Sequence, residues 1–142
     1  MHKQANQLPS WRELAARLGT LHADGERGGD YYGRQALVEL LGADMLRDAV
    51  DYYLNREVGS ELARSVLHLL RAAPAADRCL EVYQTETDPN KRAAAVELLR
   101  AVASECHLPW VLRFFNDPDP AIQNWGAGVL ESIWNLGVMR ES

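Results

Sequence analysis

A helical phrase of about twelve residues recurs along the chain and constrains the fold more than any other feature of the sequence. Its four copies start at Asp30, Gly59, Asp88 and Asp119, and each ends in a leucine. These final leucines, at positions 41, 70, 99 and 130, are 29, 29 and 31 residues apart. A period of this length is typical of repeat proteins, in which each unit is one supersecondary element. We therefore expect units of similar structure that pack against their neighbours.

Each phrase has the pattern of an amphipathic helix with a defined start. Asp30, Asp88 and Asp119 can accept hydrogen bonds from first-turn amides, and a proline follows two of them at the position that needs no amide donor. Gly59 provides the weakest of the four starts. Apolar residues then recur at helical spacing, as in residues 95–102. One side of every phrase is therefore expected to be buried.

A shorter amphipathic segment precedes every phrase. These segments are residues 11–21, 44–55, 75–86 and 108–116. Helix breakers such as Gly42 and Pro74 lie in the expected connections. The sequence thus predicts an all-α fold, an α-solenoid of about four helical hairpins with eight helices, in which neighbouring pairs cover each other's apolar sides.

The chain length predicts a single domain. A chain of 142 residues can bury a sufficient core without disulfides or metals, and no shift in composition marks a second domain. Residues 1–9 are polar and expected to be flexible, and residues 23–29 are glycine-rich and expected to form a loop.

The third phrase carries a family resemblance. Asp88-Pro89, followed by Arg92, Ala95 and Leu98-Leu99, resembles a HEAT repeat, especially the short bacterial form also found in phycobilin lyases. The resemblance extends over about residues 30–137. It implies an array of helical hairpins that can serve as a scaffold, an enzyme subunit, a DNA-repair enzyme or an inhibitor.

The arginine of the family pattern is present in only two units. Arg34 and Arg92 keep it, whereas Ala63 and Gln123 replace it. The resemblance therefore implies the family's contact between aspartate and arginine of one repeat in those two units alone.

The net charge limits the classes of partner. The formal charge is −5 and the pI about 5.3, which disfavours nucleic acid as a partner. No run of eighteen apolar residues is present, so no membrane span is expected. We expect a cytoplasmic protein, apart from any leader already removed. Cys79 and Cys106 are expected to be reduced, buried thiols.

The second helix of each pair lines the concave side if the resemblance holds. Keeping the helical phase constant across repeats then identifies charged and polar positions on that side. A solvated helix face is the alternative explanation for each position. The residues expected to contact a protein are Gln35, Glu39, Arg64, His68, Arg71, Glu97, Arg100, Asn124 and Glu131. Changing Arg64, Arg71 and Arg100 to glutamate is expected to abolish binding and leave the helices intact.

Aromatic residues are a second set of candidates. Adjacent aromatics on a helix are about 100° apart, so one of each pair is expected to be partly exposed. Tyr31, Tyr52 and Trp134 are therefore candidate protein contacts, and packing between repeats is the alternative.

Catalytic and metal sites are not expected. Asp117 and Asp119 are explained as a turn residue and a helix cap, and Glu105-Cys106-His107 as neighbours in a loop, because consecutive side chains rarely converge. The four histidines, His2, His22, His68 and His107, lack a paired spacing for a metal. No phosphate-binding loop follows a strand, so no cofactor is expected either.

These observations favour a non-catalytic module that binds another protein. A bacterial inhibitor or immunity protein that covers a toxin or enzyme, and an adaptor, are the specific forms considered. The first alternative is nucleic-acid binding with Arg64, Arg71 and Arg100 on phosphates. The second is a lyase or chaperone subunit for a chromophore protein, which depends on the family resemblance alone. The repeat pattern specifies no oligomeric state.

Overall fold

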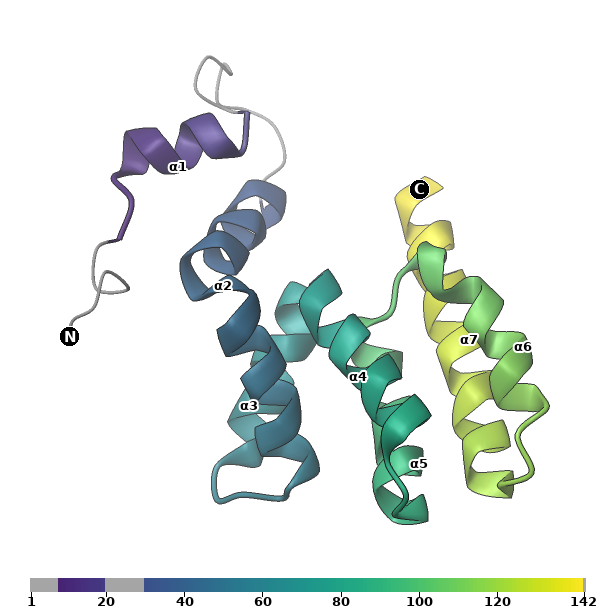
Figure 1. Ribbon diagram of the computed structural model, residues 1–142. Coiled ribbons are helices and arrows are strands. Elements are labelled where there is room, and N and C mark those ends of the chain that lie inside the picture. The colour runs from purple at the N-terminus through teal and green to yellow at the C-terminus, as the bar shows by residue number, and fades with distance from the viewer. Residues whose placement is uncertain (1–7, 20–29, 142) are drawn as a thin grey trace. The chain divides into compact units, whose positions relative to one another are not determined.

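The computed structural model describes residues 8–19 and 30–141, with side chains described through residue 137 (Figure 1). This part of the chain contains seven α-helices, one short 3-10 helix and no strand, which confirms the predicted all-α class. The chain divides into two compact units, Met1–Gly42 and Ala43–Ser142, and each is described by itself. One continuous repeat domain stays a prediction. Residues 1–7 of the predicted flexible segment and the predicted loop 23–29 lie outside the described residues.

The first unit begins with a capped helix. In α1 (Trp11–Arg17), the Ser10 hydroxyl accepts from the Glu13 amide at 3.1 Å, and the Ser10 amide donates to the Glu13 carboxylate at 2.7 Å. This reciprocal pair satisfies two amides that would otherwise lack partners. Leu14 is the buried residue of α1, and Arg17 lies 3.5 Å from Glu39.

The helix α2 (Asp30–Leu54) covers two segments that the sequence predicts as separate helices. Gly42 within it has φ 83° and ψ 160°, a conformation that favours glycine. The regular backbone is thus interrupted at the predicted breaker. Gly42 separates two helical segments that share the label α2, so the predicted number of eight helices stays a prediction.

The second unit contains the last part of α2 and all later helices. These are α3 (Ser60–Leu70), α4 (Ala73–Thr85), α5 (Pro89–Val102), the 3-10 helix η2 (Glu105–His107), α6 (Leu108–Phe115) and α7 (Pro120–Glu141). Their bounds agree with the predicted segments to within a few residues, except that α7 continues well beyond its phrase.

The helix starts follow the predicted capping chemistry. Asp88 accepts from the Asn90 amide at 3.0 Å, and Asp119 accepts from the Ala121 amide at 2.9 Å, which confirms both caps. Gly59 precedes α3 without a side-chain cap, as expected for the weakest start. Pro74 was expected between helices, but it lies in the first turn of α4, where its missing amide leaves no bond unmade.

The core of the second unit lies between successive helices. α4 packs on α5, α6 packs on α7, and α5 contacts both α3 and α7. Phe114 of α6 is fully buried. A Cβ at Gly126 would lie only 2.7 Å from the Phe114 Cβ, so the glycine permits the close approach of α6 and α7. Other fully buried side chains include Leu67, Val96, Leu98, Leu99, Ile122 and Val129.

A buried carboxylate ties three segments together. Asp117, between α6 and α7, accepts from the Tyr83 hydroxyl at 2.9 Å, from Arg92 at 3.0 Å and from the Asp119 amide at 2.9 Å. Burial raises the pKa of Asp117, but these hydrogen bonds outweigh it and hold the pKa below its ordinary value of 3.8. Asp117 is therefore a turn residue, as predicted, and also a buried anchor, which the sequence did not predict.

Arg92 keeps the arginine of the HEAT-like pattern but makes a different contact from the one expected. Arg92 binds Asp117 and the Tyr83 carbonyl, whereas Asp88 of its own phrase caps α5. The Arg92 side chain therefore bonds to the segment between α6 and α7, within the next predicted repeat. Gln123, which replaces the arginine in the fourth phrase, donates to the Asp117 carbonyl at 2.7 Å. Arg34 lies 3.8 Å from Asp30, within its own phrase.

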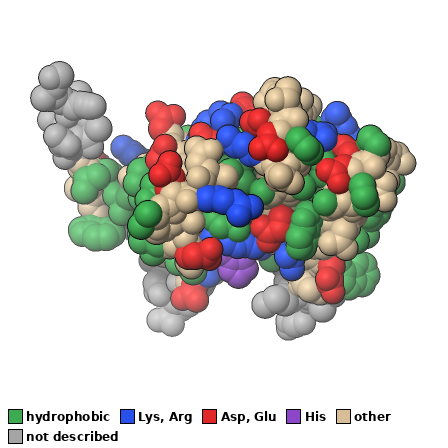
Figure 2. Space-filling view, turned by 90° about the horizontal axis from the view of Figure 1, so that it is seen from below, with side chains coloured by type: hydrophobic (Ala, Val, Ile, Leu, Met, Phe, Trp, Pro, Cys, Tyr) green, Lys and Arg blue, Asp and Glu red, His purple; other side chains and the backbone are tan. Residues whose placement is uncertain are grey.

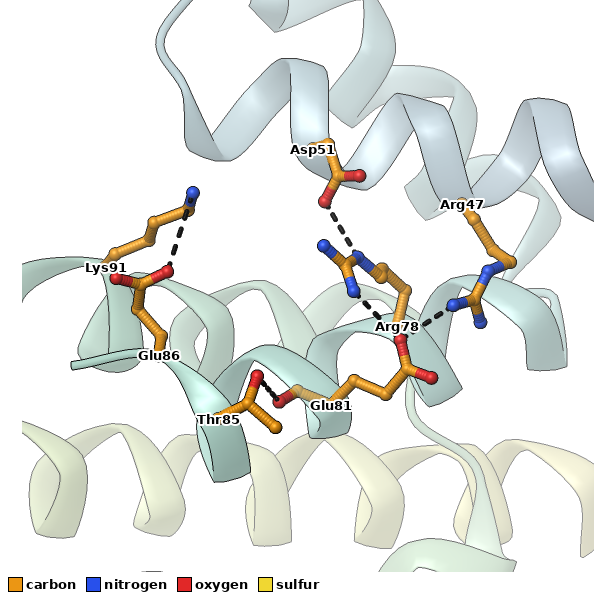
Figure 3. Close-up of polar contacts among 7 residues, drawn as sticks. All are labelled: Arg47, Asp51, Arg78, Glu81, Thr85, Glu86 and Lys91. Atoms are coloured by element: carbon orange, nitrogen blue, oxygen red, sulfur yellow. Dashed lines mark hydrogen bonds and ion pairs between the residues drawn. The ribbon is translucent and has the colours of Figure 1, made fainter. Parts of the chain in front are cut away.

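Four charged residues form a balanced cluster on α2 and α4 (Figure 3). Arg78 donates to Asp51 at 2.8 Å and to Glu81 at 2.9 Å, and Arg47 donates to Glu81 at 2.7 Å. Two cations therefore meet two carboxylates. The hydrogen bonds to both arginines lower the pKa of Glu81. We call Arg47, Asp51, Arg78 and Glu81 the balanced cluster.

Candidate binding groove

A groove of about 450 Å³ opens on the face made by α3, α5 and α7. Each of these helices contributes residues to its walls. Figure 2 views the molecule from below and shows basic side chains next to acidic ones and to a histidine. The lining residues are His68, Arg71, Arg100, Gly128, Glu131, Ser132, Asn135 and Leu136.

Arg71 holds the three helices of the groove together. It is the residue that ends α3, with φ 46° and ψ 49° in the left-handed region, an uncommon conformation for a residue other than glycine. Its guanidinium donates to the Ala101 carbonyl at 2.9 Å, the Ala103 carbonyl at 2.8 Å and the Ser132 hydroxyl at 2.9 Å. Arg71 therefore satisfies acceptors at the C-terminal end of α5.

Ser132 completes this arrangement from α7. Its hydroxyl accepts from Arg71 and donates to the Arg100 carbonyl at 2.6 Å. The hydroxyl thus has its donor and its acceptor both engaged. Burial lowers the pKa of Arg71, and its Nε lies buried without a hydrogen-bond partner. The guanidinium of Arg71 is therefore hydrogen-bonded to neutral groups.

Arg64 and Arg100 share one carboxylate beside the groove. Glu97 of α5 accepts from Arg64 of α3 at 2.7 Å and from Arg100 at 3.3 Å. Arg64 also lies over the Tyr53 ring and Arg100 over the Trp125 ring, at 5.5 and 5.3 Å from the centroids. We call Arg64, Arg71, Arg100 and Glu97 the arginine face, because it has three cations and a single anion.

Gly128 of α7 makes space for Arg100. A Cβ at this position would lie 2.9 Å from the Arg100 Nε and 3.0 Å from its Cδ. Any other residue would push the Arg100 side chain aside. Gly128 thus sets where the guanidinium of Arg100 lies in the groove.

The structure brings together part of the predicted contact set. His68, Arg71, Arg100 and Glu131 line the groove, and Arg64 and Glu97 flank it through the shared ion pairs. Asn124 and Trp134 are exposed on α7 but do not line the groove, and 69% of the Trp134 surface is accessible. Tyr31, Gln35 and Glu39 belong to the first unit.

The contacts in the structure bear on two assumptions behind the predicted set. The phase rule treated its positions as pointing to solvent, but Arg64 and Arg71 are half-buried. Changing all three arginines to glutamate was expected to leave the helices intact, yet Arg71 also bonds the end of α5. That triple change would therefore disturb the fold together with the surface.

Tyr52 has a structural contact as well as an exposed surface. Its hydroxyl donates to the Val58 carbonyl in the turn between α2 and α3. Tyr52 is 39% exposed and Tyr31 is 53% exposed, so both retain accessible ring surface. The predicted partial exposure of one member of each tyrosine pair is confirmed.

Sequence reasoning missed Gly128, Ser132, Asn135 and Leu136 as site residues. Asn135 is one helical turn beyond Glu131, and the rows of equal phase stopped at the end of the repeated phrase. Extending the rows by one turn would have reached it. Gly128 has the same helical phase as His68 and Glu97, but its role depends on the neighbouring Arg100 side chain.

The segment 104–107 brings a thiol close to an imidazole. The Cys106 sulfur lies 3.7 Å from both ring nitrogens of His107 and 3.3 Å from the Ser104 hydroxyl. His107 Nδ1 accepts from the Ser104 amide at 2.9 Å. Cys106 is exposed, so its predicted burial was wrong, whereas Cys79 is buried and free as expected. Burial raises the pKa of the Cys79 thiol.

Two further searches of the described residues gave negative results. Residues 8–19 and 30–141 contain no group of three metal-ligating side chains, and His2 and His22 lie outside these ranges. No helix of the same ranges combines the length and apolarity needed to cross a membrane.

Comparisons of this chain with protein-family models, with curated proteins and with solved structures gave no match.

Proposed function

We propose that the chain is a HEAT-like repeat protein that binds another protein, without catalysis, through the groove on α3, α5 and α7. The observation that carries this proposal is the convergence of His68, Arg71, Arg100 and Glu131 on one groove. These residues lie within or directly after three successive phrases of the repeat. Positions of equal phase on successive repeats form a continuous surface, which is the usual binding surface of such arrays.

The order of helix contacts supports the repeat assignment. α4 and α5 form one packed pair, α6 and α7 form the next, and α5 contacts the second helix of the pair on either side. The Arg92 guanidinium also donates to Asp117, which lies in the next proposed repeat. Each pair thus contributes an equivalent element to the proposed array.

The chemistry of the groove supports protein binding. Its walls combine guanidinium, imidazole, carboxylate and amide groups with the apolar Leu136, a mixture that suits a hydrogen-bonded protein contact. Ser132 is engaged on both sides and is not free to act as a nucleophile. A small protein with this surface can serve as an inhibitor or as an adaptor.

Site-specific photo-crosslinking in cells of the source organism tests the proposal. A photoreactive amino acid replaces His68 in the groove or, as a matched control, Asp77, which is exposed on α4. We expect a discrete protein adduct from position 68 and none from position 77, identified by mass spectrometry. Equal adducts at both positions, or crosslinks from position 68 to nucleic acid alone, would contradict the proposal.

A further inference from the structure

The groove carries a positive charge that the described side chains do not balance fully. Arg71 donates only to the neutral oxygens of Ala101, Ala103 and Ser132. Among the described side chains, no carboxylate lies within ion-pair distance of Arg71. A half-buried cation bonded to neutral groups keeps its field, because neither water nor a counter-ion screens it fully.

The second cation of the groove is only partly compensated. Arg100 reaches Glu97 at 3.3 Å, but Glu97 is also the partner of Arg64 at 2.7 Å. Glu131 is the one carboxylate among the groove-lining residues. Three arginines against Glu97 and Glu131 leave a local excess of +1 on a chain of net charge −5. This local excess of positive charge lies where α3, α5 and α7 meet.

We propose that this groove binds a carboxylate of an acidic protein segment, with Arg100 as the direct contact and Arg71 as a fixed charge beside it. This inference rests on the proposed function and specifies its partner. The Arg100 side chain is 42% exposed and can donate to a ligand. Arg71 cannot turn toward a ligand, because three acceptors hold its guanidinium. His68 and Asn135 are exposed and offer further donors.

Gly128 serves as a positioning residue for this contact. Its missing Cβ leaves the space that the Arg100 stem occupies. Gly128→Ala therefore moves Arg100 without changing any charge, whereas Arg100→Gln removes the charge. Arg71 is unsuitable as the tested position because its loss would also affect the end of α5.

A protein carboxylate fits this groove better than a nucleic-acid backbone. Glu97 and Glu131 flank the guanidiniums and would repel phosphates held at fixed spacing along a backbone. One carboxylate of an acidic peptide can instead contact Arg100 on its flexible side chain, while the neighbouring carboxylates turn to solvent. Nucleic-acid affinity also depends on neutralising several phosphates at once. The local excess is one charge, which matches one carboxylate.

The test titrates the full chain with a capped hexaglutamate peptide and, separately, with capped hexaglutamine. Nitrogen-edited NMR follows the Nε–H signal of Arg100, and calorimetry gives the affinity. We expect hexaglutamate alone to bind and to shift this signal. Binding should weaken about tenfold in Arg100→Gln and several-fold in Gly128→Ala, which corresponds to the loss of a charge-assisted hydrogen bond. Arg47→Gln in the balanced cluster should leave it unchanged.

Two results would overturn the inference. If hexaglutamate fails to bind, or binds equally well to Arg100→Gln, the groove does not select carboxylates. If an oligothymidine of matched charge binds more tightly through Arg100, the ligand is a phosphate backbone. A protein adduct from position 68 together with no hexaglutamate binding would retain the proposed function and remove only the acidic partner.

Discussion

The balanced cluster and the arginine face belong to the same unit and use arginine in opposite ways. In the balanced cluster, Arg47 and Arg78 meet Asp51 and Glu81, so the local charge is zero. On the arginine face, Arg64 and Arg100 share Glu97, and Arg71 has neutral acceptors instead of a carboxylate. This contrast indicates that hydrogen bonds to neutral groups can fix a cation in place while its charge stays available to a partner.

Among the substitutions considered, replacement of the buried Asp117 is expected to cause the largest loss in free energy of unfolding. Asp117→Asn should lower the free energy of unfolding by about 3 kcal/mol near neutral pH, because it leaves the Arg92 charge without its buried partner. Urea denaturation measures this loss. Asp77→Asn on the exposed side of α4 is the matched control and should change little.

The same variant has a defined pH dependence. The pKa of Asp117 is lowered in the folded chain, so its contribution is present above the ordinary value of 3.8 and is lost as the pH falls through the lowered pKa. The stability difference between the wild type and Asp117→Asn should therefore shrink in acid. A difference that stays constant down to strongly acidic pH would exclude this explanation.

The next largest effect is expected at Arg71, where the arginine face can be compared directly with the balanced cluster. Arg71→Ala leaves the acceptors at the end of α5 without their donor and should lower the free energy of unfolding by about 2 to 3 kcal/mol. Arg71→Gly loses the same bonds but relieves the left-handed backbone, so its loss should be about 1 kcal/mol smaller. Urea titrations compare both with Arg47→Ala. If Arg47→Ala costs as much, the two arginine environments are equivalent.

Glu97→Gln removes the anion of the arginine face and so increases its difference in charge from the balanced cluster. Loss of the carboxylate shared by Arg64 and Arg100 should lower the free energy of unfolding by about 1 to 2 kcal/mol. It should also strengthen hexaglutamate binding several-fold, since Arg100 loses its competing partner. Calorimetry measures peptide binding to this variant and to the control Glu86→Gln, whose carboxylate pairs with Lys91 and lies outside the arginine face. Weaker peptide binding in Glu97→Gln would argue against a charge-driven groove.

The smallest effect is expected in the balanced cluster. Arg78→Gln should change the free energy of unfolding by no more than about 1 kcal/mol, because solvent screens partly exposed ion pairs. The effect should diminish further at high salt. Thermal unfolding at low and high ionic strength measures both. A loss that is large and independent of salt would mean that the cluster behaves as a buried network.

Local signals predicted the helices and four of the groove residues. Capping at Asp88 and Asp119 and apolar spacing act within one or two turns, so they can be read from neighbouring residues. Constant helical phase then identified His68, Arg71, Arg100 and Glu131, since the repeat step keeps their orientation similar.

The bonding of these residues could not be read in the same way. The acceptors of Arg71 lie 30, 32 and 61 residues further along the chain, and nothing in the local pattern selects them. The burial of Asp117 likewise depends on Tyr83 and Arg92, which are 34 and 25 residues away. Long-range partners therefore changed the roles of residues whose positions were predicted correctly.

The long reach of Arg71 has a consequence for how the second unit folds. Helical pairs close over short stretches of chain, whereas the bonds of Arg71 join residues up to 61 positions apart. These bonds require α3, α5 and α7 to have already assembled, so we expect them to form late in folding, after the main barrier. Loss of Arg71 should then accelerate unfolding and leave the folding rate almost unchanged, which makes this side chain a determinant of the lifetime of the folded state.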